Sequence, residues 1–384
     1  MLKILIAPDK FKGTLSAMQV AEAIRDGLAA GFGPEMPAEF HLLPIADGGE
    51  GTTETLCNIL NANVLELPAQ DALGRPCQGA AGLAGELGIL EVAAAAGMWR
   101  IAAEERDPWK SSTFGVGLML RELEVRGARR ILAGLGGSAT NDAGLGMAAA
   151  VGFRFIDKAG RQVLPLPQNW DSIVAVARPE KPLLVEVTVL CDVTNPLLGP
   201  KGASHVYGPQ KGVKDPGFID KAMERVTDLV VKCLGSDYRG KPGAGAAGGL
   251  GYGFLTFTNA HLVEGFRTIA ELTHLEDAVA EADLVITGEG RIDTQTFSGK
   301  GPSGIASLAV RLGKPVHLFC GLLGADLAAS DLDPAIRSEL ATWSGIHPLV
   351  GEGVTSHEAL ADSARVLRRR ASQLAKVLRS HRAI

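Results

Sequence analysis

The chain is poor in the residues that mark several classes of protein. Only five of its 384 residues are cysteines, and no two of them form a Cys-x-x-Cys pair. This excludes a zinc ribbon or a thioredoxin-type motif, and a sparse, odd set of cysteines is typical of reduced thiols in a cytoplasmic protein. Lysine and arginine number 38 against 43 acidic residues, a net charge of −5, so we expect no nucleic-acid partner.

Long apolar segments are lacking as well. The apolar runs stay well below the ~20 residues of a membrane-spanning helix. The run at 2–6 is followed at once by Asp9, Lys10 and Lys12, unlike a signal peptide. No His-Glu-x-x-His or Gly-x-Ser-x-Gly motif occurs, which argues against zinc hydrolases and serine hydrolases. We therefore expect a soluble, cytoplasmic protein without a membrane partner; the sequence carries no signal of oligomeric state.

Glycine, in contrast, is abundant. The chain contains 48 glycines, one residue in eight against an average of about 7%. They follow no three-residue period, which excludes collagen, and they interrupt apolar runs rather than filling polar tracts, which argues against disorder. The composition predicts many tight turns where the backbone closely approaches another backbone or a ligand.

Apolar runs alternate with loops and amphipathic segments, a pattern that predicts an α/β fold. The chain length favours two domains, and turn-rich passages at 67–76 and near 273–283 are possible boundaries. The expected strands are 2–6, 40–45, 64–67, 88–92, 131–135, 184–191, 283–287 and 315–320. The expected helices are 16–30, 50–60, 113–126, 142–151, 217–234, 301–312 and 356–379.

The loop GLGGSA at 134–139 directly follows an apolar strand and is the best candidate for a phosphate site. Backbone N–H groups in a glycine turn at a helix N-terminus bind anions, and Ser138, Thr140 and Asn141 add hydroxyl and amide donors. The same loop fits a relaxed dinucleotide fingerprint, with Asp157 placed 18 residues further on. The polar residues favour a reactive phosphate over a buried pyrophosphate, and a plain capped turn is the alternative.

Two other glycine loops are weaker candidates. GAGAAG at 243–248 has the full G-x-G-x-x-G pattern, but it follows RGKP rather than a strand, so it indicates a glycine-lined ligand wall or a close domain contact. GKG at 299–301 resembles the end of a P-loop, yet Thr294 and Gly301 stand where that motif needs Gly and Ser or Thr. It is not a Walker-type site.

Charged side chains gather after the predicted strands. ADGGEGT at 46–52 contains Asp47 and Glu50, which could act as a general base or hold a metal, with helix capping by Asp47 as the alternative. CDVTNPLLG at 191–199 contributes Asp192 and Asn195. The loop at 288–300 and the first loop contribute Glu289, Arg291, Asp293, Thr296, Lys300, Asp9, Lys10 and Lys12. Cations, carboxylates and anion-binding turns are the parts that phosphoryl transfer requires.

Seven ordered motifs together resemble the bacterial type 1 glycerate kinase family. They are APDKFKGTLSA, PIADGGEGT, GLGGSATNDAGLGM, CDVTNPLLG, GPQKG, GAGAAGGLGYG and ITGEGRIDTQTFSGKGPSGIA. The likeness runs from Lys3 to about Ala309, with the motifs in the expected order. The resemblance implies an ATP- and Mg²⁺-dependent kinase that converts D-glycerate to phosphoglycerate, with 2-phosphoglycerate favoured.

The resemblance also implies two α/β domains. One is a Rossmann-like (flavodoxin-like) domain with a parallel sheet built from both chain ends, residues 1–66 and 284–384. The other is an inserted α/β domain at 67–283, and the active site is expected in the cleft between them. Lys10 stands where Ser is common, Ala143 and Leu145 replace small loop residues, and Tyr207 replaces Phe.

Within this reading we assign roles by chemistry. Asp192 or Asp47 is the candidate base, and Asp293 and Glu289 are the candidate Mg²⁺ ligands. The candidate ATP-binding residues are Lys12, Gly136, Gly137, Ser138, Thr140 and Asn141. The candidate glycerate-binding residues are Lys10, Arg291, Lys300 and Asn195.

Two rival functions remain open from the residues alone. One is an NAD(P)-dependent oxidoreductase of a small hydroxy acid that uses the 134–139 loop and Asp157. The other is a sugar-acid sensor that binds glycerate without turnover.

Overall fold

The computed structural model describes residues 1–297, 301–328 and 332–382. Its internal contacts divide the chain into two compact units, one formed by residues 1–46 and 266–384 and the other by residues 47–265. Each unit is built on a largely parallel sheet with helices packed against it, which confirms the predicted α/β fold class. None of the described helices is long and apolar enough to cross a membrane.

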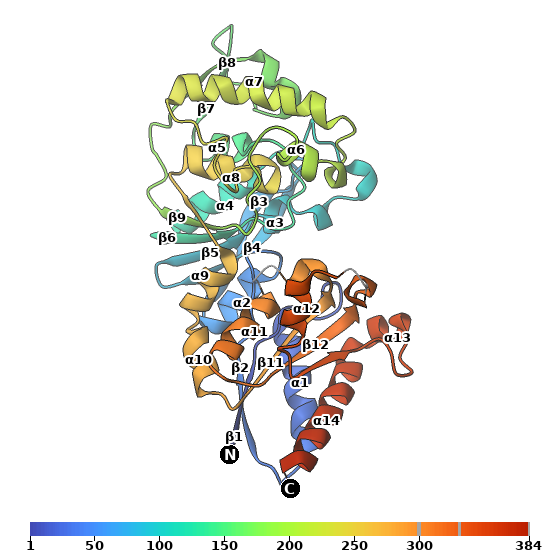
Figure 1. The fold of residues 1–384 in the computed structure, drawn as a ribbon. Helices are drawn as coiled ribbons and strands as arrows, with labels where there is room; N and C mark the ends of the chain where they lie inside the picture. Colours follow the sequence, from blue (N-terminus) through green and yellow to red (C-terminus); the bar gives the residue numbers. More distant parts are fainter. Residues whose placement is uncertain (298–300, 329–331, 383–384) are drawn as a thin grey trace. The chain divides into compact units, whose positions relative to one another are not determined.

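The first unit contains a five-stranded sheet in the order β13-β12-β11-β1-β2, with every pair parallel (Figure 1). The strands are β1 (Leu2–Ile6), β2 (Ala38–Leu42), β11 (Leu284–Ile292), β12 (Val316–Leu323) and β13 (Gly345–Pro348). Numbered along the chain, this order is 2-1-3-4-5, the flavodoxin-like arrangement. The Rossmann-like sheet built from both chain ends is therefore confirmed.

Helix α1 (Ala17–Phe32) lies side by side with α14 (Ser363–Arg382), and both pack on this sheet (Figure 1). A capping box starts α1: the Ser16 hydroxyl accepts from the Gln19 N–H at 3.4 Å, and the Gln19 side chain accepts from the Ser16 N–H at 2.9 Å. Gly27 of α1 faces the α14 backbone so closely that a Cβ there would overlap it. Glycine thus sets how closely these two helices approach.

The second unit contains a six-stranded sheet in the order β10-β9-β6-β5-β4-β3. Its strands are β3 (Asn63–Gln70), β4 (Pro76–Ala84), β5 (Leu87–Glu91), β6 (Arg130–Gly134), β9 (Glu186–Leu190) and β10 (His261–Val263). The pairs from β5 to β10 are parallel, whereas β3, β4 and β5 pair antiparallel. The turn-rich passage 67–76, where a boundary was expected, closes the β3–β4 hairpin.

The unit boundaries differ in position from the expected ones at 66/67 and 283/284. Helix α2 (Thr52–Ile59) belongs to the second unit because it packs against β4 and β5. Helix α10 (Leu275–Glu281) belongs to the first unit because it packs against β1 and α11 (Gly301–Arg311). Relative to the sequence-based boundaries, the first unit therefore lacks α2 and additionally contains α10 and nearly all of α9 (Gly265–Leu272).

The segment 356–379, expected as one helix, forms two helices. Helix α13 (Ser356–Ala361) ends at Asp362, whose backbone leaves the helical conformation with φ −148° and ψ 61°. The Asp362 carboxylate then accepts from the Arg365 N–H at 3.2 Å and caps the start of α14. A carboxylate that accepts from a helix N-terminus competes with a continuous helix.

Candidate active site

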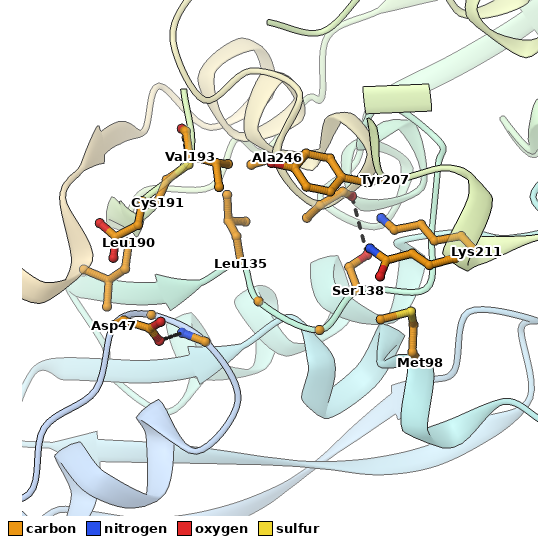
Figure 2. Close-up of a pocket in the computed structure, with 17 residues that line it drawn as sticks. Asp47, Met98, Leu135, Ser138, Leu190, Cys191, Val193, Tyr207, Lys211 and Ala246 are labelled. Carbon is orange, nitrogen blue, oxygen red and sulfur yellow. Dashed lines mark hydrogen bonds between the residues drawn. The ribbon is translucent and has the colours of Figure 1, made fainter. Parts of the chain in front are cut away.

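A cavity of about 250 Å³ opens in the second unit where β6 and β9 end (Figure 2). The carboxyl ends of parallel strands are where α/β sheets place ligands. Five residues from the predicted set line this cavity, namely Asp47, Gly136, Gly137, Ser138 and Asp192. The other lining residues are Gly48, Gly49, Met98, Leu135, Leu190, Cys191, Val193, Tyr207, Gln210, Lys211, Ala246 and Ala247.

The two predicted glycine loops at 46–52 and 134–139 lie against each other at the cavity. The Gly136 N–H donates to the Gly48 carbonyl at 3.3 Å, and a Cβ at Gly136 would overlap the backbone of Gly49. Gly137 has φ +76°, a conformation that favours glycine. The glycines therefore allow backbone-to-backbone contact, as their abundance predicts, and the Gly136 amide is already used within the protein.

The 134–139 loop does not lead straight into a helix, in contrast to the prediction of a helix at 142–151. Helix α5 starts only at Leu145 and runs to Ala150, because Ala143 and Gly144 adopt left-handed backbone angles, with φ +53° and +73°. The expected anion site at a helix N-terminus is therefore not formed by residues 134–139. Donors at this end of the cavity must come from the loop itself and from side chains around it.

Thr140 and Asn141 lie behind the cavity wall rather than on it. Both are fully buried. The Thr140 hydroxyl is hydrogen-bonded to the Ser138 hydroxyl at 2.8 Å, and the Asn141 amide donates to the Ser204 hydroxyl at 3.0 Å. These hydrogen bonds hold Ser138 and the loop in place, and the contact of Thr140 and Asn141 with ATP stays a prediction.

Lys211 is a buried cation of the cavity that the sequence-based assignment missed. Lys211 is only 3% exposed, and its amine donates to the Thr140 carbonyl at 2.7 Å. Burial lowers the pKa of Lys211 to about 7, and nearby Asp142 opposes part of that shift. The available signal in the sequence was the GPQKG motif at 208–212, which is one of the motifs that carry the family resemblance and contains this lysine.

Asp142 is a fully buried carboxylate surrounded by donors. It accepts from the Thr113 N–H at 2.7 Å, the Thr113 hydroxyl at 2.8 Å, the Gly144 N–H at 3.1 Å and the Gly146 N–H at 3.2 Å. Burial raises the pKa of Asp142, and these hydrogen bonds oppose the rise. The carboxylate ties the turn before α5 to the start of α4 (Phe114–Val125).

The two candidate bases are the carboxylates of the cavity wall. Asp47 accepts from the Gly49 N–H at 2.8 Å, and Asp192 accepts from the Gly265 N–H at 2.9 Å. Asp47 does not cap α2, because the N-cap residue of that helix is Gly51, whose N–H donates to Glu91 at 3.1 Å. The capping alternative for Asp47 is therefore wrong, and its carboxylate faces the cavity.

Asn195 contacts the cavity through Tyr207. The Tyr207 hydroxyl donates to the Asn195 side-chain oxygen at 2.7 Å, and the Asn195 amide donates to the Lys201 carbonyl at 2.8 Å. Tyr207 lines the cavity, whereas Asn195 is not among the lining residues. Asn195 is thus placed to orient Tyr207, which the sequence-based assignment had not selected.

The GAGAAG segment forms part of the wall and of a close backbone contact. Ala246 and Ala247 line the cavity. Gly248 and Gly249 follow with φ +71° and +88°, and a Cβ at Gly248 would overlap the Thr140 carbonyl. This arrangement matches the expectation of a ligand wall or tight contact rather than a dinucleotide site.

The remaining candidates belong to the first unit. Lys10 and Lys12 follow β1, while Glu289 and Arg291 lie on its neighbour β11 and Asp293 comes directly after that strand. In the flavodoxin-like order, ligands bind where β1 and the third strand of the sheet, here β11, end side by side. Lys300 lies outside the described residues.

One of the two acidic residues here pairs with a neighbouring, exposed arginine. Arg291 forms an ion pair with Asp293 at 3.1 Å, so the guanidinium predicted to hold substrate is paired with a predicted metal ligand. The Thr296 hydroxyl donates to Glu289 at 3.4 Å and accepts from the Asp293 N–H at 3.3 Å. These contacts gather the two carboxyl-bearing residues around one hydroxyl.

Glu289 and Asp293 fit the needs of Mg²⁺. This ion prefers oxygen ligands and is usually held by one or two carboxylates, with phosphates and water completing its octahedron. Glu289 and Asp293 each carry such a carboxylate: that of Glu289 accepts from the Thr296 hydroxyl, and that of Asp293 pairs with Arg291. Among the described residues no group of three or more His, Cys, Asp or Glu forms a self-sufficient metal site, so any Mg²⁺ here would depend on substrate oxygens.

Asp157 is not placed to serve a dinucleotide. It ends β7 (Arg154–Asp157), which pairs with β8 (Ile173–Ala177) in a separate two-stranded sheet. The Asp157 carboxylate accepts from the Arg161 N–H at 2.9 Å in the exposed turn that follows. A dinucleotide fold needs this acid on the strand next to β6, and the oxidoreductase alternative lacks that geometry.

Known proteins resemble this chain over most of its length. A family model described as the glycerate kinase family matches residues 4–379. A glycerate kinase of Bacillus subtilis (strain 168) is 40% identical over 332 residues, which are 85% of this chain and 86% of that protein. A glycerate 2-kinase of Escherichia coli (strain K12) is 37% identical over 334 residues, 85% of this chain and 87% of that protein.

A solved structure agrees over the full length. The crystal structure of a protein designated glycerate kinase 2 from Salmonella typhimurium LT2 is 34% identical and superposes with a TM-score of 0.84. The match covers 100% of both chains. The similarity therefore includes both units and the cavity-lining loops.

Proposed function

The chain belongs to the glycerate kinase family, and on that premise we propose that it transfers a phosphoryl group from ATP to a hydroxyl of D-glycerate. It is a phosphotransferase with an alcohol group as acceptor. The observation that carries the proposal is the cavity of the second unit, which is lined by two carboxylates, Asp47 and Asp192, and by the cation Lys211. Figure 2 shows Asp47 and Lys211 on opposite sides of the view. A small hydroxy acid has matching parts, a hydroxyl whose proton a carboxylate can accept during transfer and an anionic carboxylate that a cation can bind.

The size of the cavity supports a small acceptor. Pockets for drug-sized ligands enclose roughly 300–1,000 Å³, and this cavity encloses about 250 Å³. A molecule with three carbons is suited to it better than a whole nucleotide. We propose 2-phosphoglycerate as the product, a choice supported by the relative that is named a glycerate 2-kinase.

Asp192 is our first candidate for the general base and Asp47 the second. A base must reach the acceptor hydroxyl and accept its proton as the new phosphorus–oxygen bond forms, help that is typically worth roughly 10²–10⁴-fold in rate. The Gly265 N–H holds one Asp192 oxygen, which fixes the direction of the carboxylate. We propose that Ser138 and the glycine loop at 136–137 contact the phosphoryl group in transit, with Asn195 orienting Tyr207 beside them.

The first unit contributes the remaining proposed roles. We assign Lys12 as a clamp on the ATP phosphates, and Lys10, Arg291 and Lys300 to anionic groups of the substrates. Glu289 and Asp293 would hold Mg²⁺, which when bound neutralises charge on the phosphates. The ion pair of Arg291 with Asp293 would keep both side chains oriented before substrate arrives.

A coupled assay of ADP release tests the function. The purified chain is given ATP, Mg²⁺ and either D-glycerate, L-glycerate or related hydroxy acids, and the product is identified by ³¹P NMR. We expect saturable ADP release with D-glycerate and a phosphate ester at the 2-position. Absence of glycerate-dependent ADP release, or binding of glycerate without turnover, would refute the kinase and favour a sensor.

The role of Asp192 is tested by Asp192→Asn, with Asp237→Asn as the matched control, because Asp237 is an aspartate of the second unit outside the cavity lining. We expect kcat to fall at least about a hundredfold in Asp192→Asn and to stay near wild type in the control. Near-normal turnover of a folded Asp192→Asn variant would remove Asp192 as the base and leave Asp47.

A further inference from the structure

Lys211 has hydrogen-bond donor capacity that no other described residue uses. It extends from the turn η4 (Pro209–Lys211) toward Ser138 at one end of the cavity (Figure 2). Its amine makes one hydrogen bond within the described part of the chain, to the Thr140 carbonyl at 2.7 Å. A lysine ammonium carries three donors. Lys211 is 3% exposed and lines the cavity, so its remaining N–H donors are available to a ligand there.

Lys211 also lacks an ion-pair partner among the described residues. Asp142 is the carboxylate that acts on Lys211, yet its oxygens accept from Thr113, Gly144 and Gly146. No ion pair within 4.0 Å joins Asp142 to Lys211 among the described residues. The other titratable groups of the cavity are Asp47, Asp192, Cys191 and Tyr207. Figure 2 places Asp47 at the opposite end of the view from Lys211.

We propose that Lys211, together with the Ser138 hydroxyl, binds an anionic oxygen of the substrates in this cavity and takes up a proton from solvent when that anion binds. The proposal rests on the proposed function, because it takes the glycerate carboxylate and the phosphoryl group of ATP as the two sources of such an oxygen. An anion supplies both the missing charge partner and an acceptor for the unused donors. Hydrogen bonds between ammonium and anion are about twice as strong as neutral ones.

The proton uptake follows from the burial of the amine. Burial lowers the pKa of Lys211 to about 7, so in the empty cavity roughly nine-tenths of the amine is neutral at pH 8. An anion favours the charged form and raises the pKa again. Binding thus becomes weaker by about tenfold for each pH unit above 7, whereas below pH 6 it is independent of this group.

The test is the pH dependence, between pH 6 and 9, of kcat/KM for D-glycerate and, separately, for ATP. It compares the whole wild-type chain with Lys211→Met, Lys211→Arg and the control Lys214→Met, which removes an exposed lysine that does not line this cavity. In the wild type we expect kcat/KM of one substrate to fall above about pH 7. The substrate that shows the fall identifies the source of the anion.

The variants separate binding of an anion from structural support. Lys211→Met should lower kcat/KM for that substrate at least about a hundredfold at pH 6 and abolish the fall above pH 7. Lys211→Arg keeps a charge at every pH in this range, so it should restore most of kcat/KM at pH 6 and also lack the fall. Lys214→Met should match the wild type.

Two results would overturn the proposal, and a third concerns the function alone. Wild-type kcat/KM for both substrates in Lys211→Met at pH 6 would show that no anion meets this amine. A fall above pH 7 that persists in Lys211→Arg would assign the titration to another group, and this comparison holds even when thermal unfolding shows that Lys211→Met is misfolded. A wild-type chain without glycerate-dependent ADP release would refute the proposed function itself, whatever the variants do.

Discussion

Replacing the buried carboxylate Asp142 by its amide should destabilise the second unit strongly although the side chain keeps its shape. The perturbation is Asp142→Asn. Three donors converge on one carboxylate oxygen, the N–H and hydroxyl of Thr113 and the N–H of Gly146, while the Gly144 N–H donates to the other oxygen. An asparagine can present its carbonyl oxygen to the group of three, and its NH₂ then faces the Gly144 N–H.

The magnitude follows from counting those contacts. A hydrogen bond to a charged group contributes about 1.5–3 kcal/mol and a neutral one about 0.5–1.5 kcal/mol, so three bonds lose about 1 kcal/mol each. A buried N–H that faces another donor costs about 1–3 kcal/mol more. The gain from no longer burying a charge, visible as the raised pKa of Asp142, offsets part of this loss. We expect a net loss of about 2–4 kcal/mol in the free energy of unfolding.

The assay is thermal unfolding followed by tryptophan fluorescence. Three of the four tryptophans, Trp99, Trp109 and Trp170, belong to the second unit, so their signal reports on it. For a unit of this size, 1 kcal/mol changes Tm by about 2–4 °C. The transition of the second unit in Asp142→Asn should therefore move down by about 5–15 °C.

The matched control is Asp215→Asn, which makes the same change of charge at an exposed helix start. Asp215 caps α7 (Pro216–Leu234) by accepting from the Phe218 N–H at 3.0 Å, and asparagine caps a helix about as well as aspartate. We expect its Tm to remain within about 2 °C of wild type. Equal Tm values for the two variants would refute the argument that the buried carboxylate is stabilised by its four donors.

Two further predictions concern the first unit. Gly27→Ala should lower the free energy of unfolding, measured by chemical denaturation, by about 1–2 kcal/mol. The clash of its Cβ with Ala371 and the α14 backbone outweighs a gain in helix propensity of about 1 kcal/mol. In the control Gly217→Ala the new Cβ meets no close neighbour, so this variant should be neutral or stabilising in the same measurement. Burial lowers the pKa values of the stacked pair His317 and His347 to about 4 each. Between pH 6.5 and 4 the unfolded chain then binds more protons than the native one, so stability should fall with decreasing pH by up to about 3 kcal/mol per unit, and a double His→Gln variant measured by denaturant titration should flatten this slope.

The sequence predicts most of the described parallel strands but misses the short strands β10 and β13, and it predicts the glycine-rich elements poorly. Strand β1 coincides with the expected 2–6 because a strand buried on both faces is a continuous apolar run. Strand β4 was missed because PCQGAAGLA contains no β-branched residue. Its Gly79 and Gly82 instead lie against Met119 and Cys57, where a Cβ would collide. Such a preference for glycine depends on neighbours distant in sequence, which local propensity does not describe.

The start expected for the helix at 142–151 was wrong for a related reason. The expected helix 142–151 begins three residues late because the polar side chain of Asp142 is used inward, by donors from 113 and 146, rather than as a helix residue. The periodicity of apolar residues cannot reveal that use. The inward position of the Asp142 side chain can be predicted only from its contact with Thr113, which is 29 positions away in the sequence.

The residues of the candidate site likewise fall into those that the sequence predicted and one, Lys211, that it missed. Ser138 and Asp192 were found from sequence because they follow β6 and β9, neighbouring parallel strands that end at one edge of the same sheet. Asp47 follows β2, a strand of the other sheet, and reaches the cavity because its loop contacts Gly136. Lys211 was missed because a lysine in a Pro-Gln-Lys-Gly turn is typical of an exposed loop. Its amine is buried against the Thr140 carbonyl, which is 71 residues away in the sequence. Gly248 packs closely against that same carbonyl. A group whose chemistry depends on burial can be located only after the fold is known, which is why the cation of this cavity, rather than its carboxylates, is the residue that the structure adds.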